Sequence, residues 1–529
     1  MKRLYFLIPP FILSVIPTIS EYNHNIKYLT IDRTFLPFEL SLLFGMAVVF
    51  LFSIILRNRQ KTSILSSISI FLFFSYGYFY LILGDSIIVN FLPFSLNIFL
   101  FAICLFLFIG VWHLLRTKKI DLIKIQTLLI VFSGSILLIN LMQIIPFEIT
   151  RSISAHRLKS YLSENTVNPH ISNLNDNDKP DIYYFIFDRY ARQDVLDEYL
   201  GFDNSEFVSE LDSEGFYVAS RSAANYPHTF LSLSSSLNMT YLDGVEESLG
   251  VDNLAETPVY DQLIQKNEVE KVLQKAGYRY VVAGDFWDPT RTAPDSEELI
   301  NLFSTFDEFH LYIYERTALN SFLGMISDKQ IYVGVERLER IAKNLYYRLD
   351  GITSQSNNST PDFVFAHFLL PHEPVVFAPD CQPMSFEDIR SLSPEEGYLV
   401  QLQCANKIMI EIAHQTKETS KRPVVIIFQS DEGPFKPTKY FNVDGELIPN
   451  DDEARHIHSS ILNAIYLSPR PSDESVDYAK LGFTDDMTPV NTFRIIFNYY
   501  FDASLPLLEN KTYLSSQKQP YNFFQIETY

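Results

Sequence analysis

The chain has 529 residues, a formal net charge of −21 and 47% hydrophobic residues, and its charge is unevenly distributed. Residues 1–150 carry a net charge of +5, so the remaining 379 residues carry −26. A part this acidic has no basic face that would neutralise phosphates, which argues against nucleic acid as a partner. The chain therefore divides into a cationic N-terminal part and a long acidic C-terminal part.

The N-terminal part, residues 1–150, contains five long apolar runs. The last four exceed the roughly 20 residues that are needed to cross a hydrocarbon layer of about 30 Å. The first is interrupted by prolines and is also compatible with a signal peptide, but no small-residue cleavage site follows it, so we expect an uncleaved helix. We predict a transmembrane domain with spans at about 4–20, 36–56, 64–84, 91–115 and 122–146.

The basic residues of this part predict its orientation. If the spans alternate, nine of its eleven basic residues lie on one side, and these are Lys2, Arg3, Arg57, Arg59, Lys61, Arg116, Lys118, Lys119 and Lys124. Basic loops face the cytoplasm. Five spans that begin inside end outside, so we expect a multi-pass protein of the cytoplasmic (inner) membrane whose C-terminal domain is extracytoplasmic.

The two cysteines of the outer part fit this topology. Cys381 and Cys404 are the only cysteines after residue 150. In an oxidising compartment such a pair is expected to form a disulfide, and the alternative is two unpaired buried thiols.

The C-terminal part is predicted to be an α/β domain. After a polar linker at 151–180, residues 181–529 alternate between strand-like and helical segments. This alternation indicates a mostly parallel sheet with helices on both faces. The strand-like runs lie at 181–187, 215–220, 278–284, 362–368, 424–428 and 461–467, and clear helical patterns lie at 259–276, 334–350 and 396–416.

Sites in such sheets form at the carboxyl ends of the strands, so the residues that follow each strand are candidates. They are Asp188 after the first strand, His367 and His372 at and beyond the end of the fourth, and Asp431 and Glu432 after the fifth. Taken alone, the turn SDEGP that holds the last two is more typical of a solvated loop.

Thr229 lies in NYPHTFLSLSSSLN (225–238), where a helical pattern begins. Backbone N–H groups at a helix N-terminus stabilise an anion, although a threonine there also suits a helix cap. Coordination to a divalent metal lowers the pKa of a hydroxyl and makes it a nucleophile. With Asp188, Asp431 and Glu432, Thr229 forms an all-oxygen ligand set for one divalent metal, which favours Mn²⁺ or Mg²⁺ over Zn²⁺.

These motifs and their order resemble the alkaline phosphatase and sulfatase superfamily, and within it the lipoteichoic acid synthase and phosphoethanolamine transferase branch. Members of that branch also join five membrane helices to an outer catalytic domain. The resemblance covers the architecture of the whole chain and the order of motifs over about 180–500. It implies that Asp188 and Asp431 bind metal and that Thr229, with Ser232 and Leu233 in a T-x-x-S-L pattern, is the nucleophile.

The resemblance also implies that His372, in PHEP, helps to bind the phosphate or the leaving group. Glu432 stands where the branch has a histidine, and glutamate is also a metal ligand. No C-x-P-x-R or S-x-P-x-R signature occurs at the nucleophile, so ordinary sulfatase activity is not expected.

Further residues are expected near the substrate. His367 suits either the site or the core, and EARHIHSS offers His456 and His458. Asn225 is placed to contact a substrate or to shape the turn before Pro227.

We therefore predict a membrane-anchored, metal-dependent transferase. It would move a phospho-alcohol group of the phosphoglycerol or phosphoethanolamine type from a membrane phospholipid to a surface glycan or glycolipid, through a phosphothreonine intermediate. The alternatives are a phosphodiesterase or other hydrolase of the same fold and a metal-free scaffold in envelope assembly. The sequence does not indicate an oligomeric state.

Overall fold

The computed structural model describes most of the chain, and it divides into two compact units. The first comprises Met1–Thr150 with Phe306–Arg337, and the second comprises Arg151–Thr305 with Leu338–Tyr529. The described residues are 5–84, 95–117, 120–165, 167, 169, 171–172, 174–175, 178–250, 253, 256–303, 308–327, 333–355, 358–434 and 452–527.

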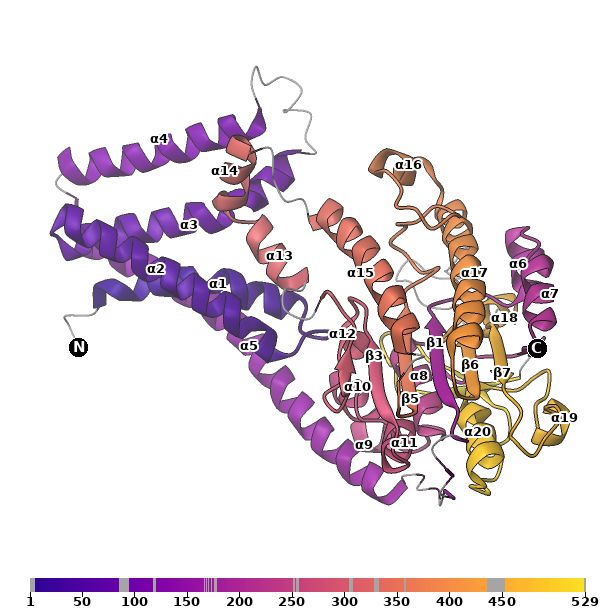
Figure 1. The fold of residues 1–529 in the computed structure, drawn as a ribbon. Coiled ribbons are helices and arrows are strands. Elements are labelled where there is room, and N and C mark those ends of the chain that lie inside the picture. The colour runs from indigo at the N-terminus through magenta and orange to yellow at the C-terminus, as the bar shows by residue number, and fades with distance from the viewer. Residues whose placement is uncertain are drawn as a thin grey trace. The chain divides into compact units, whose positions relative to one another are not determined.

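The described part of the first unit, called here the membrane unit, contains five helices that are long and apolar enough to span a membrane, which confirms the predicted number (Figure 1). Large apolar side chains such as Phe50 and Phe106 remain exposed on them, as is typical of helices that face lipid. The helices are α1 (Ile8–His24), α2 (Phe35–Leu56), α3 (Arg59–Gly84), α4 (Leu96–Thr117) and α5 (Leu122–Asn165).

Two features of this unit differ from the sequence-based expectation. The helix α5 continues through Asn165, so the first half of the expected linker at 151–180 is helical. No glycine or proline follows Pro146 in this stretch, and nothing therefore ends the helix at the end of the apolar run. Two short helices from the middle of the chain, α13 (Glu308–Glu315) and α14 (Ala318–Ser327), also belong to the membrane unit.

The second unit contains the predicted catalytic residues and is called here the catalytic unit. It is built on a seven-stranded sheet in the order β2-β7-β6-β1-β5-β3-β4. Neighbouring strands from β6 to β4 are parallel, whereas β7 is antiparallel to β6 and β2 is antiparallel to β7. The predicted mostly parallel sheet is thereby confirmed. The strands are β1 (Asp181–Phe187), β2 (Tyr217–Val218), β3 (Arg279–Ala283), β4 (Glu298–Leu299), β5 (Asp362–Phe368), β6 (Val424–Gln429) and β7 (Asn463–Leu467), with a separate hairpin of β8 (Thr512–Leu514) and β9 (Phe524–Ile526).

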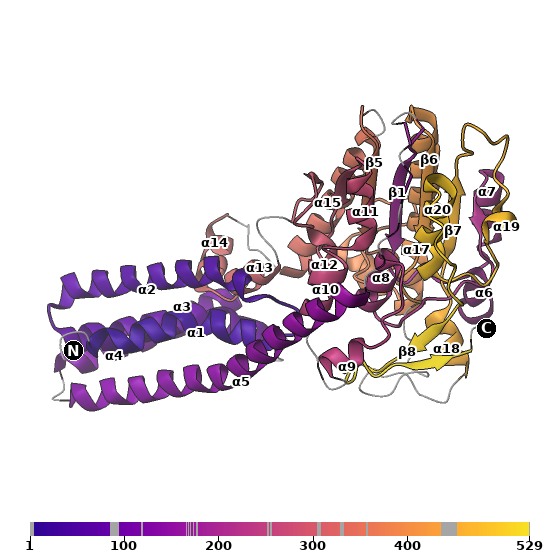
Figure 2. The same ribbon diagram turned by 90° about the horizontal axis from the view of Figure 1, so that it is seen from below.

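Helices cover both faces of this sheet (Figures 1 and 2). One face of β1 presents Tyr184 and Ile186 to a core that includes α8, α11 and α20, and the other presents Tyr183 and Phe185 to a core that includes α7, α15 and α17. Every residue of β1, β5 and β6 is buried because these central strands are covered on both faces. The helices of this unit are α6 (Gln193–Leu200), α7 (Ser205–Ser213), α8 (Thr229–Asn238), α9 (Val245–Leu249), α10 (Thr257–Leu263), α11 (Glu268–Lys275), α12 (Asp288–Arg291), α15 (Val333–Gln355), α16 (Phe386–Ser391), α17 (Pro394–Thr419), α18 (Asp452–Ser459), α19 (Tyr478–Leu481) and α20 (Thr492–Phe501).

Local signals explain two of these boundaries. The helical pattern at 259–276 is split into α10 and α11 because Asn267 caps α11, where its side chain accepts a hydrogen bond from the backbone N–H of Glu270. The helix α17 begins with a capping box between Ser393 and Glu396. It carries Cys404, which is joined to Cys381 by a disulfide, whereas Cys104 in the membrane unit is unpaired.

Candidate metal centre and active site

The central strand β1 and its two neighbours bring three potential metal ligands together. Asp188 follows the last residue of β1, His367 lies one residue before the end of β5, and Asp431 lies two residues beyond β6. The register pairs Ile186 with His367 on one side and with Gln429 on the other. Because all three strands are parallel, their carboxyl ends meet at one edge of the sheet, as expected for this type of fold.

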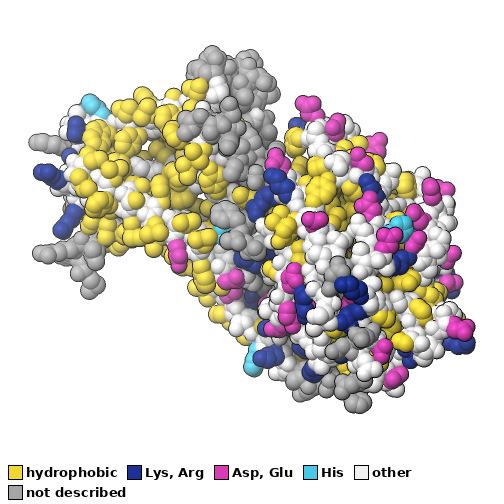
Figure 3. Space-filling model, viewed as in Figure 1, with side chains coloured by type: hydrophobic (Ala, Val, Ile, Leu, Met, Phe, Trp, Pro, Cys, Tyr) yellow, Lys and Arg dark blue, Asp and Glu magenta, His cyan; other side chains and the backbone are white. Residues whose placement is uncertain are grey.

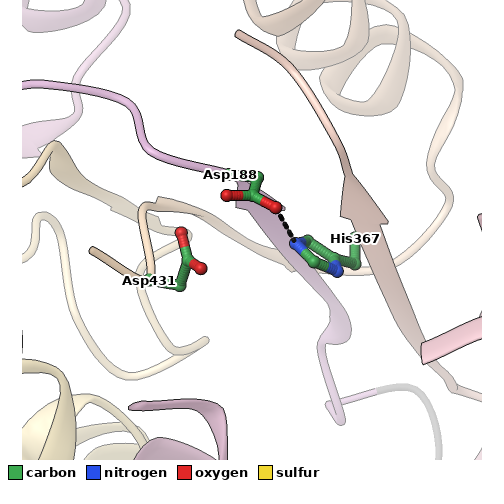
Figure 4. A group of neighbouring side chains, drawn as sticks. All are labelled: Asp188, His367 and Asp431. Carbon is green, nitrogen blue, oxygen red and sulfur yellow. Dashed lines mark ion pairs between the residues drawn. The ribbon is translucent and has the colours of Figure 1, made fainter. Parts of the chain in front are cut away.

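The ligand atoms of Asp188, His367 and Asp431 all lie within 4.8 Å of one another (Figure 4). His367 Nε2 is 3.5 Å from Asp188 Oδ2. The three residues are 4%, 0% and 1% exposed, respectively. Buried polar atoms in folded proteins nearly always have partners, yet Asp188 Oδ1, His367 Nε2 and Asp431 Oδ2 have no hydrogen-bond partner among the described residues. A cation at their centre would satisfy all three.

Thr229 lies beside this group as the first residue of α8. Burial and the negative charges of Asp188 and Glu432 raise the pKa of Asp431 well above its usual value, while hydrogen bonds from the Thr229 hydroxyl and the Arg189 N–H act in the opposite direction. The Arg189 N–H lies 3.0 Å from Asp431 Oδ1. The Thr229 hydroxyl therefore stands at a helix N-terminus, close enough to Asp431 to affect the pKa of that carboxyl.

Glu432 is placed differently from the expectation that it would be a metal ligand. Its Oε1 is 2.6 Å from Arg189 Nε, and its Oε2 accepts a hydrogen bond of 3.1 Å from the His228 N–H. Burial raises the pKa of Glu432, but the charges of Arg189, His458 and His228 outweigh this and lower it to about 2. Both carboxylate oxygens are thus engaged, and Glu432 is not in the group formed by Asp188, His367 and Asp431.

His367, which was expected either near the substrate or in the core, takes the place in this group that was predicted for Glu432. Its Nδ1 is 3.0 Å from the hydroxyl of Thr290, and the Trp287 ring meets the imidazole edge-on at 5.4 Å. The Nδ1 contact leaves Nε2 directed towards the carboxylates, which is the arrangement found for histidine ligands of metals. The backbone oxygen of His367 accepts a 2.6 Å hydrogen bond from Arg348.

Sequence reasoning missed Thr290 and Arg348. Arg348 is buried, pairs with Asp285 at 2.5 Å and also donates to the Ala283 oxygen, so it joins the carboxyl ends of β3 and β5. Both residues lie in short or amphipathic helical segments where a single polar residue carries no signal of its own. Only the three-dimensional arrangement assigns them a role.

The other predicted residues have mixed positions. Burial raises the pKa of Asp188, but interactions with His372, His367 and Arg189 bring it below its usual value. The His372 Nδ1 itself contacts the backbone oxygen of Glu373. His458 Nε2 is 3.9 Å from Glu432 Oε2, whereas His456 Nε2 is 3.0 Å from Asp194.

Asn225 does not belong to the group. It is buried, its Oδ1 accepts a hydrogen bond from the Val490 N–H, and its Nδ2 donates to the Lys511 oxygen. Its amide therefore holds the turn before Pro227 in place, which is the second of the two roles considered from the sequence.

The charges of the site suit a divalent cation. Three buried carboxylates, those of Asp188, Asp431 and Glu432, face one guanidinium, that of Arg189. The excess is two negative charges when all three carboxylates are ionised and the histidines are neutral, and buried charges require compensation. Because His367 adds a nitrogen to the ligand set, Zn²⁺ suits these residues as well as Mn²⁺ does, and the preference expected from an all-oxygen set does not hold.

Comparisons with known proteins give structural similarities only, because no family model and no curated protein matches the chain. The C-terminal periplasmic domain of EptC from Escherichia coli in complex with Zn is 13% identical over 68% of this chain and 96% of that chain, with a TM-score of 0.40. The lipooligosaccharide phosphoethanolamine transferase EptA from Neisseria meningitidis, an integral membrane protein, is 11% identical over 94% of this chain and 96% of that chain, with a TM-score of 0.39.

A protein of the alkaline phosphatase superfamily from Vibrio parahaemolyticus is 10% identical over 71% of this chain and 83% of that chain, with a TM-score of 0.38. These identities and TM-scores are low, so the function proposed below rests on the residues of this chain. The solved structures to which the chain is similar thus include two phosphoethanolamine transferase structures and a member of the alkaline phosphatase superfamily.

Proposed function

We propose that this chain is a membrane-anchored, metal-dependent transferase that moves a phospho-alcohol group from a membrane phospholipid to a surface glycan or glycolipid. The observation that carries the proposal is the convergence of three buried, unsatisfied ligand atoms on Asp188, His367 and Asp431 next to the hydroxyl of Thr229. A metal-free scaffold would have no reason to bury these atoms without partners.

The residues of the site have separate roles in this reaction. Asp188, His367 and Asp431 would hold one divalent cation, and such a cation lowers the pKa of a neighbouring hydroxyl and offsets negative charge on a phosphate. Thr229 Oγ attacks the phosphorus of the lipid head group. The bond from phosphorus to the diacylglycerol oxygen breaks, and that oxygen takes up a proton equivalent to the one that Thr229 gives up.

The second step regenerates Thr229. The phospho-alcohol group is now esterified to Thr229, and a hydroxyl of the acceptor attacks the phosphorus. The bond to Thr229 Oγ breaks, and the threonine regains a proton. The backbone N–H groups at the start of α8 stabilise negative charge on the phosphate in both steps. We propose that His372 assists proton transfer at the leaving group.

The membrane unit supports a lipid donor. Five candidate spans tether the catalytic unit to the bilayer, which keeps the site near its substrate. The positive-inside rule and the disulfide between Cys381 and Cys404 both support an extracytoplasmic catalytic unit on an inner-membrane protein.

The experiment uses the full chain reconstituted in vesicles that contain phosphatidylethanolamine and phosphatidylglycerol, each labelled in the head group. Elemental analysis before and after supplementation with manganese, magnesium and zinc measures bound metal, and mass spectrometry of the peptide that contains Thr229 measures the covalent adduct. We expect about one divalent metal per chain and an adduct at Thr229. The adduct should be absent in Thr229→Ala and present in Ser205→Ala, which also removes a hydroxyl from the first residue of a helix.

The outcomes separate the alternatives. An adduct that is released to added glycan acceptor supports the transferase. Release to water alone, with or without acceptor, would indicate a hydrolase. If no divalent metal binds under any of the three supplements, the transferase and the hydrolase are both excluded, and the scaffold becomes the leading explanation.

A further inference from the structure

The membrane unit contains an apolar groove of about 370 Å³ between α3, α4 and α14. This volume lies within the range of roughly 300–1,000 Å³ that is typical of small-molecule sites. Its walls are mainly aromatic and aliphatic side chains, among them Phe73, Tyr76, Phe101, Phe108, Leu319 and Phe322. None of the described residues that line it is charged.

The α14 wall is firmly attached to the membrane unit through the turn that precedes it. A Cβ atom at Gly77 would lie 2.3 Å from the Arg316 Cα, so the backbones of α3 and this turn are in direct contact. The Arg316 guanidinium pairs with the Glu21 carboxylate and lies 4.6 Å from the centre of the Tyr78 ring. The Gly77 N–H lies 2.9 Å from the Arg316 oxygen. The groove is therefore a formed feature of the unit.

The polar groups of the groove cannot hold water well. Among the described lining residues, the polar groups are the hydroxyls of Ser69 and Tyr76 and the thiol of Cys104. The Tyr76 hydroxyl already donates to the Asn97 backbone oxygen at 2.9 Å. A buried water needs two to four polar partners, and this groove offers few. On α14, Leu319, Phe322 and Met325 are 43%, 50% and 44% exposed, which leaves a large apolar surface uncovered within the membrane unit. Hydrophobic (yellow) side chains cover much of this unit in Figure 3.

We propose that this groove binds an acyl chain of a membrane glycerophospholipid. Two of its walls, α3 and α4, are candidate membrane spans, so the medium that meets the groove is hydrocarbon. With the orientation proposed above, Gly77 and Leu96 lie near the outer ends of their spans, and the chain would come from the outer leaflet. The inference concerns the membrane unit alone and does not depend on the reaction proposed for Thr229.

The apolar lining favours an acyl chain over a polar ligand, because none of the described residues that line the groove is charged. A helix from a second copy of the protein is the alternative occupant, and cross-linking distinguishes it from an acyl chain.

The test uses the full chain in vesicles of phosphatidylethanolamine and phosphatidylglycerol that contain a small fraction of phospholipid with a diazirine in one acyl chain. After illumination, mass spectrometry locates the adducts. We expect them to concentrate on groove residues of α3, α4 and α14 rather than on α2 or α5. Cys104→Phe and Ala318→Phe fill the groove from two different helices, α4 and α14. Each should reduce groove adducts about tenfold, because a bulkier side chain overpacks the groove when an acyl chain is bound and so lowers the affinity.

Gly110→Phe is the matched control, because it lies on the same helix as Cys104 and a Cβ atom there meets nothing within 4 Å. It should leave the adduct pattern unchanged. Adducts spread evenly over all five spans, or unaffected by both groove variants, would show that only boundary lipid is present and would overturn the proposal. Adducts replaced by cross-links between copies would identify a second chain as the occupant and would also overturn it.

A second measurement uses the unaltered chain, so that the proposal can still be tested if the variants fail to fold. Cys104 is the single unpaired cysteine, so alkylation by a membrane-permeant maleimide reports on the groove alone. Long-chain phospholipid should slow this alkylation relative to a short-chain phospholipid of the same head group. Equal rates would contradict occupancy by an acyl chain.

Discussion

Glu432 offers the sharpest test of the site, because the sequence and the structure assign it different partners. Its carboxylate is 3% exposed and lies 2.6 Å from Arg189 Nε, whose side chain is 18% exposed. Replacing one member of a buried ion pair costs about 3–5 kcal/mol when the other charge is left uncompensated, and here Arg189 keeps the weaker attraction of Asp188 and Asp431. We therefore expect Glu432→Gln to lower the stability of the catalytic unit by roughly this amount, discounted towards the lower end because Arg189 keeps some contact with solvent.

The substitution Glu432→Gln should leave metal binding unchanged. Asp188, His367 and Asp431 remain in place, so elemental analysis should still find a divalent metal in Glu432→Gln, while Asp431→Asn should lose it. Thermal unfolding of the full chain, followed in the same samples, measures the stability. Arg189→Met combined with Glu432→Gln serves as the control, because removing both charges should restore part of the lost stability. Loss of metal in Glu432→Gln without a change in unfolding temperature would refute the assignment of Glu432 to Arg189.

Three further predictions follow from single contacts. Thr290→Val removes the hydroxyl 3.0 Å from His367 Nδ1 and should weaken metal binding about 10–100-fold in a chelator competition. Thr290→Ser keeps a hydroxyl and should retain the affinity. Equal metal affinity in the unaltered protein and both variants would rule out a positioning role for Thr290. Burial raises the pKa of Asp181 from 3.8 to about 6, so the folded state loses stability as the pH rises from about 4 through 6. Asp181→Asn should remove this loss, which is about 3 kcal/mol. Parallel pH profiles of the unfolding temperature for the two proteins would contradict this prediction. Gly77→Val should displace the turn at Arg316 and speed hydrogen exchange in peptides from 308–327. Gly84→Val should not, because a Cβ atom at Gly84 meets nothing within 4 Å. Unchanged exchange in both variants would show that the contact at Gly77 does not hold α13 and α14.

Much of the architecture was accessible from the sequence because it depends on local patterns. Apolar runs of sufficient length mark the five spans, and short apolar runs mark β1, β5 and β6 whatever their partners are. The rule that sites lie at the carboxyl ends of parallel strands then selected Asp188 and Asp431. Thr229 followed from the start of a helical pattern after Pro227.

The boundaries that failed depend on contacts distant in sequence. Nothing in 306–337 indicates that this segment leaves the catalytic unit, because its apolar side chains are equally typical of a core helix. It joins the membrane unit through the ion pair of Arg316 with Glu21, two residues that are 295 positions apart in the chain. It also joins through the close backbone contact at Gly77, which a Cβ atom would prevent. No local pattern contains such a pairing.

The sequence by itself determined the five spans, the order of the strands along the chain and the edge of the sheet where the acidic residues gather. Only the tertiary structure decided which side chains meet there. Asp431 and Glu432 are adjacent in the chain, yet Asp431 turns towards His367 and Asp188 while Glu432 turns towards Arg189. Neighbouring residues beyond a strand point in different directions. The partner that each one meets depends on which strands lie next to its own, and the order of residues in the chain does not specify this.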